Sequence, residues 1–152
     1  MHRLKLAFHL GLICSVAATS GCSGPVGSDR EWERQLGVID TGGFQPPPIV
    51  LPETVEQGVP FTATVLTFGS SGCVRADGAD VHLSGLTAHV RPYDLIAVSA
   101  NVVCTDDLGP HPREVTLRFD AAGEATVLVL GLTQQGASTQ YEARLQVVSP
   151  IN

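Results

Sequence analysis

Apolar and polar residues alternate along almost the whole chain after Pro48, in runs interrupted by glycine, proline and aspartate roughly every eight to twelve residues. In the run from Val115 to Phe119, and again from Tyr141 to Val147, every second side chain is apolar. This period of two predicts strands that turn one face toward a core. The predicted strands cover residues 49–55, 60–68, 79–84, 87–91, 95–104, 113–120, 124–132 and 139–148.

Short strands at this spacing, without a long helix, predict an all-β domain over residues 49–152. The expected fold is an antiparallel two-sheet sandwich of about seven or eight strands, with one face of each sheet buried. In strand number and spacing the domain resembles immunoglobulin-like modules. It lacks the tryptophan that antibody domains pack on their disulfide, because the only tryptophan, Trp32, precedes the domain.

One hairpin can be aligned residue by residue. Gly85 and Leu86 form a two-residue turn with glycine first, as a type II′ turn requires. This turn sets apolar residues opposite apolar ones, histidine opposite histidine and acid opposite base, and a slip of one residue would lose these matches. The predicted pairs are Leu83 with Ala88, Val81 with Val90, His82 with His89, and Asp80 with Arg91.

Two cysteines within the domain, Cys73 and Cys104, are predicted to form a disulfide, as is common in exported proteins. Cys104 shares its strand parity with Ile96 and Val98, so we expect it to point into the core and join the two sheets. The alternative, a metal site made by these thiols, lacks the closely spaced cysteine pairs that zinc sites use.

The start of the chain has the three parts of an export signal. Arg3 and Lys5 give a basic start, residues 6–18 form an apolar run, and small residues lead into a cysteine. The run is too short to cross a bilayer as a helix, which takes about 20 residues. The segment at 18–22 resembles the lipobox of bacterial lipoproteins.

This resemblance implies how the chain is processed and where it resides. The signal peptide, residues 1–21, is removed, Cys22 is acylated and becomes the first residue, and Ser23 favours the outer membrane. Thr19 stands where the family prefers an aliphatic residue, so cleavage nearby, giving a soluble secreted form, is the alternative. The expected location is the cell envelope, with the membrane as the partner of the lipid.

Residues 22–48 are rich in glycine, proline and polar side chains, which predicts a tether between the anchor and the domain. The three prolines at 46–48 favour an extended, stiff end to this tether. The domain is then expected to be held away from the bilayer.

A short helix is predicted within the tether. Ser28 and Glu31 have the spacing of a helix-capping box. The apolar residues that follow would lie on one face of that helix: Trp32, Leu36 and Ile39.

Charge argues against nucleic acid as a partner. Removal of the leader takes away Arg3 and Lys5 from the nine basic residues and none of the fifteen acidic ones, which leaves 7 minus 15, or −8. A protein that binds a polyanion needs a basic patch, and no part of this sequence clusters its arginines.

Two sets of residues are candidate cation sites. His82 and His89, facing each other across the hairpin, could bind zinc or copper if a third ligand were supplied, and the alternative is a solvated pair. A Cys73–Cys104 bond would also bring together loops that carry carboxylates of the kind calcium prefers, although acidic loop tips are common on soluble domains. These carboxylates belong to Asp77, Asp80, Asp106 and Asp107.

The sequence contains no serine elbow, paired-histidine zinc helix or phosphate-binding glycine loop, so we expect a binding or structural protein rather than an enzyme, with no cofactor. The expected partner is a protein or glycan, bound by the loops at 68–80 and 105–112. The alternatives are a metal-handling envelope protein that uses His82 and His89, or a protease inhibitor that inserts such loops into an active-site cleft.

Overall fold

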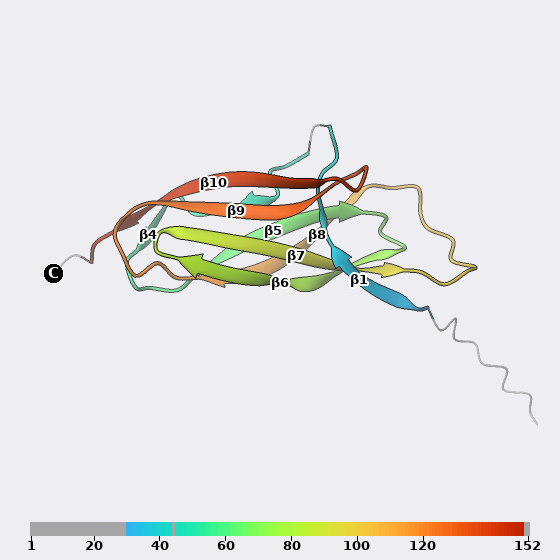
Figure 1. The fold of residues 1–152 in the computed structure, drawn as a ribbon, viewed down its shortest axis with the longest axis horizontal. Helices are drawn as coiled ribbons and strands as arrows, with labels where there is room; N and C mark the ends of the chain where they lie inside the picture. Colours follow the sequence, from blue (N-terminus) through green and yellow to red (C-terminus); the bar gives the residue numbers. More distant parts are fainter. Residues whose placement is uncertain (1–29, 44, 151–152) are drawn as a thin grey trace, which may run out of the picture.

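The computed structural model describes residues 30–43 and 45–150. The predicted leader, Cys22 and Ser28 lie outside the described residues. Within them every regular element is a β-strand and none is a helix, so the all-β class is confirmed. The strands form a seven-stranded sheet, sheet A, and a three-stranded sheet, sheet B (Figure 1).

Sheet A has the order β1-β7-β9-β10-β4, with β6 paired to β7 and β2 paired to β9. Its strands are β1 (Trp32–Leu36), β2 (Val38–Asp40), β4 (Thr54–Glu56), β6 (Val74–Ser84), β7 (Thr87–Ala97), β9 (Gly123–Thr133) and β10 (Ser138–Val148). Sheet B has the order β3-β5-β8. Its strands are β3 (Ile49–Val50), β5 (Phe61–Gly69) and β8 (Gly109–Leu117).

Sheet A is mixed, so the expectation of antiparallel sheets is wrong for it. β7 and β2 run parallel to β9, and β4 runs parallel to β10, whereas the pairs of sheet B are antiparallel. Parallel neighbours need a long crossover. Residues 98–122, which include β8 in the other sheet, supply it between β7 and β9. Two sheets around a shared core are compatible with a β-sandwich.

The core contains apolar side chains from both sheets. The alternating apolar residues of the 115–119 run are buried and their polar neighbours exposed, as predicted, and Leu145 and Val147 on β10 are also buried. Tyr141 has the same parity but is 38% exposed, so its predicted inward position is wrong. It lines a surface hollow with the prolines at 46–48 instead of packing in the core.

The helix predicted from Trp32 to Ile39 is wrong, because this segment forms β1 and β2. β1 pairs with β7, and β2 pairs with β9. Gly37 between them bonds to both neighbouring strands: its N–H donates to the Pro92 carbonyl at 2.9 Å, and its carbonyl accepts from Leu132 N at 2.9 Å. Pairing these backbone groups outweighs a local helix preference, which is a weak effect.

The three prolines at 46–48 belong to the folded domain and do not form the end of a tether that precedes it. This run connects β2 in sheet A to β3 in sheet B, and Pro48 is buried, with its carbonyl accepting a hydrogen bond from Leu66 N at 2.9 Å. Because residues 32–40 belong to sheet A, the expectation of a tether that reaches residue 48 is wrong for this part. The three prolines are therefore part of the folded domain and not of a spacer that precedes it.

β7 ends at Ala97, so the strand predicted over 95–104 is wrong beyond that residue. Residues 98–108 connect β7 in sheet A to β8 in sheet B, and we call them the 98–108 loop. The chain leaves the sheet here because it must cross to the other layer before β8 begins. The predicted strand at 49–55 also divides, into β3 and β4, which pair in different sheets.

Candidate functional site

The predicted disulfide is present, with the Cα atoms of Cys73 and Cys104 5.3 Å apart. Cys73 lies between β5 and β6, and Cys104 lies in the 98–108 loop, so the bond joins two connections that each cross between the sheets. Cys73 is 3% exposed, whereas Cys104 is exposed. The expectation that Cys104 points into the core is wrong, because the strand that would have turned it inward ends before it.

Hydrogen bonds also hold the 98–108 loop against the 70–73 turn. Gly72 N donates to the Thr105 hydroxyl at 3.0 Å. That hydroxyl donates in turn to Asp107, which also accepts from Ser71 N at 3.1 Å. The bonds from Thr105 and Ser71 stabilise the carboxylate and hold the pKa of Asp107 below its ordinary value. The loop is thus fixed by both covalent and polar contacts.

The beginning of the described chain is bound to the same loop. Glu31 N donates to Ser99 Oγ at 2.7 Å, and the Glu31 carbonyl accepts from Val98 N at 2.9 Å. Arg30 Nη1 donates to the Gly72 carbonyl at 2.7 Å. The chain therefore enters the fold beside the 98–108 loop, at the opposite end of the molecule from the C-terminal end of β10 (Figure 1).

Although its backbone is fixed, the 98–108 loop exposes apolar side chains. Val103 is 85% exposed, and Val98 and Leu108 are also exposed. Trp32, at the base of the loop, is half-buried, with the Arg75 guanidinium 4.1 Å from its ring centroid. The 70–73 turn and the 98–108 loop together form the candidate site.

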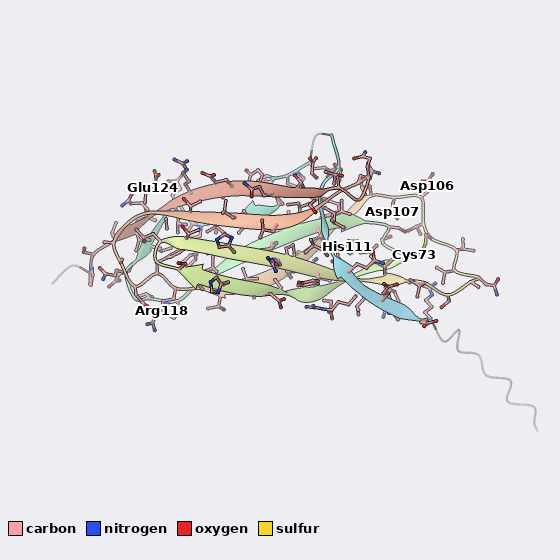
Figure 2. All side chains as sticks on the ribbon, viewed as in Figure 1. Cys73, Asp106, Asp107, His111, Arg118 and Glu124 are labelled. Carbon is pink, nitrogen blue, oxygen red and sulfur yellow. A yellow bond between two sulfur atoms is a disulfide. The ribbon has the colours of Figure 1, made fainter. Side chains whose placement is uncertain are left out.

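The four aspartates predicted as a cation site are not brought together. Asp77 and Asp80 on β6 form ion pairs with Arg34 on β1, at 2.7 and 3.9 Å. Asp106 and Asp107 lie in the 98–108 loop, at the same end as Cys73 (Figure 2). Within residues 30–43 and 45–150, no three His, Cys, Asp or Glu side chains gather in a way that could hold a metal ion.

The β6–β7 hairpin has the predicted register. His82 lies opposite His89 and Asp80 opposite Arg91, and Gly85 has a φ of +60°, which the first position of a type II′ turn requires. The imidazole ring centroids are 6.5 Å apart beside a surface hollow of about 460 Å³. The pair supplies two of the three protein ligands that a zinc site needs, and the described part of the chain brings no third to it.

A buried ion pair that was not predicted links the two sheets. Arg113 Nη2 on β8 donates to Asp94 Oδ1 on β7 at 2.5 Å, and the two side chains are only 5% and 2% exposed. Thr67 on β5 bonds to both of them. Arg113 Nη1 donates to the carbonyls of Gly78 and Tyr93. These contacts offset the cost of burying the two charges, although the buried Arg113 Nε has no hydrogen-bond partner among the described residues.

The alternation of side chains along the two strands could have predicted that this pair is buried. Arg113 has the parity of Val115, and Asp94 has that of Val90, so alternation alone turns both charges inward. Gly37 packs against the same cluster: a β-carbon there would lie 2.2 Å from Thr67 Cγ2 and 2.9 Å from Asp94 Oδ2. Glycine is therefore required where β1 and β2 meet.

Comparison with known proteins gives no identification: no family model, no curated protein and no solved structure matches this chain. Among the described residues there is no helix that is both long and apolar enough to cross a membrane.

Proposed function

We propose that this chain is an exported, lipid-anchored protein of the cell envelope whose domain acts by binding or structural association rather than by catalysis. The leader and the Cys22 motif support export and acylation. The disulfide supports export independently, because such bonds form and persist in the periplasm and outside the cell.

In this proposal the domain is a divergent immunoglobulin-like sandwich. Two sheets that share one core support this view. The parallel pairing of β7 with β9 sets the domain apart from antibody domains, whose two sheets are antiparallel.

The surface that we assign to binding is the candidate site, made of the 70–73 turn and the 98–108 loop. The observation that carries this assignment is the 85% exposure of Val103 on a loop fixed by the disulfide and by Thr105. An ordered loop loses little conformational entropy when it binds. An exposed apolar side chain also gains free energy when a partner removes it from water.

Mass spectrometry of the mature protein, purified from its host's membranes, tests the anchor. We expect a chain that begins at Cys22, carries acyl groups and lacks the thiol hydrogens of Cys73 and Cys104. A Cys22→Ser variant is the control and should leave the membrane fraction. A mature chain without acyl groups would contradict the lipid anchor, and free thiols would contradict the disulfide.

Photo-crosslinking in intact cells tests the binding surface. A photoreactive side chain at position 103 should capture an envelope component. The matched control is position 59, where Val59 is 47% exposed in the connection before β5. Equal crosslinking from both positions would argue against a binding role for the loop.

A further inference from the structure

We infer that the 98–108 loop contacts the lipid bilayer into which the anchor is inserted. The loop is then the part of the domain that touches the membrane surface. The inference rests on the proposed acylation of Cys22 and names the partner of the same surface. Three features of the molecule support it: the short chain between anchor and fold, the side chains at this end, and the charges around them.

The chain between the anchor and the fold is short. Arg30 lies eight positions after Cys22. A chain of that length spans at most about 28 Å when fully extended. Arg30 is bonded to Gly72, and Glu31 to Val98, so the base of the loop is fixed to the end of this short segment. The anchor therefore keeps this end of the domain near the headgroups.

The side chains at this end suit a membrane–water boundary. Val103 is the most exposed of the large apolar residues in the described part of the chain, and Val98 and Leu108 on the same loop are also exposed. Interfacial binding grows with the apolar area that leaves water. Trp32 and Arg75, stacked at the base of the loop, are of the kind that place an apolar body against lipid and a polar end in water.

The charges favour zwitterionic headgroups over an anionic surface. Asp106 and Asp107 within the loop and Glu31 at its base bring three carboxylates to this end, against the two guanidinium groups of Arg30 and Arg75. Hydrogen bonds from Thr105 and Ser71 lower the pKa of the Asp107 carboxyl. A strongly negative surface would repel the remaining negative charge within about a Debye length. We therefore assign the loop to a bilayer rich in phosphatidylethanolamine or phosphatidylcholine.

Trp32 provides the measurement, because it is the only tryptophan in the chain. Acylated protein is placed in phosphatidylethanolamine and phosphatidylcholine vesicles that contain bromine-substituted lipids, which quench tryptophan within contact distance. The anchor alone could bring Trp32 close to lipid. The decisive sample therefore carries ~20 additional glycine and serine residues between Cys22 and Arg30, so that the tether no longer imposes contact.

With the lengthened tether we expect Trp32 to remain quenched, because the loop binds the bilayer by itself. Val103→Ser should lower the ratio of bilayer-bound to unbound loops about fivefold, since less apolar surface leaves water. Val59→Ser, at the matched exposed valine, should leave quenching unchanged. Phosphatidylglycerol should reduce quenching at low salt and have less effect at high salt.

Several results would overturn the inference. If Trp32 is not quenched with the long tether, or if Val103→Ser is quenched as strongly as the unmodified sequence, the loop does not bind the bilayer. With an acylated Cys22, the proposed function would survive either result. A loop that is shielded only after envelope proteins are added would have a protein partner instead. An unmodified Cys22 in the host would remove the proposed anchor and this inference together.

Discussion

The two halves of the domain are held together by different interactions. In the half that contains the Gly85 turn, which we call the hairpin half, the core between the sheets is apolar and includes Val127, Leu117 and Phe119. In the other half, the disulfide half, the sheets are joined by the Arg113–Asp94 pair and by the bond between Cys73 and Cys104. One half depends on apolar burial, and the other on specific partners.

The difference matters because these interactions fail in different ways. Apolar contact is non-directional, so the loss of a methyl group removes only part of the free energy gained by burying the side chain. A buried ion pair needs both charges, since removing one leaves the other buried without a partner. We therefore expect the disulfide half to respond sharply to single substitutions and to reduction, and the hairpin half to respond mildly to substitution and not at all to reduction.

The largest effect is expected from Asp94→Leu. It leaves Arg113 buried beside Thr67 without its anion, and uncompensated buried charges of this kind cost about 3–5 kcal/mol. Urea denaturation should show a lower midpoint and a correspondingly lower free energy of unfolding.

The matched control replaces both partners. Asp94→Leu combined with Arg113→Met removes both charges while retaining apolar volume, and should recover most of the lost stability. A double variant no more stable than Asp94→Leu would show that the loss arises from packing and not from an isolated charge.

Removal of the disulfide should have the next largest effect. Cys73 and Cys104 are 31 positions apart. Closing a loop of this length stabilises a fold by about 3–4 kcal/mol on the chain-entropy model. In a double Cys→Ser variant, denaturant unfolding should show a free energy of unfolding lower by that amount. Its amide hydrogens at 98–108 should exchange faster, and the exchange rates in the hairpin at 79–91 should rise less. Uniformly faster exchange would mean that the two halves unfold as one unit.

Val127→Ala probes the hairpin half. Val127 is fully buried on β9, and removing two methyl-sized groups from an apolar core costs about 2 kcal/mol. The loss should be the same with and without reducing agent, because no covalent contact of this half depends on redox state. A loss that doubles on reduction would show that the halves are not independent.

Local patterns explain why the hairpin half could be predicted from the sequence. The β6–β7 register followed from Gly85, Leu86 and the matched pairs beside them, and the alternation at 115–119 correctly marked core positions. These features involve residues close in the sequence, where turn chemistry and period two act directly.

The disulfide half depends on contacts between distant parts of the chain. Nothing local in residues 32–40 reveals that they pair with β7 and β9, or that the chain leaves β7 at Ala97 to cross to sheet B. The Cys73–Cys104 pair was predictable because only two cysteines follow residue 22. The exposed position of Cys104 was not predictable, because it depends on that crossing.

The smallest effect is expected from acid, through Asp107. Hydrogen bonds from Thr105 and Ser71 lower the pKa of this carboxyl in the folded protein. The stability that it contributes is therefore present above the pKa of the unfolded chain, about 3.9, and is lost as the pH falls through the folded value.

Asp107→Asn keeps one acceptor oxygen but cannot ionise. Between about pH 6 and pH 3 the thermal midpoint of the unmodified protein should fall further than that of Asp107→Asn, since all other acidic groups are common to both proteins. Equal decreases would mean that the carboxylate does not hold the loop, and the disulfide would then be the main restraint on Val103.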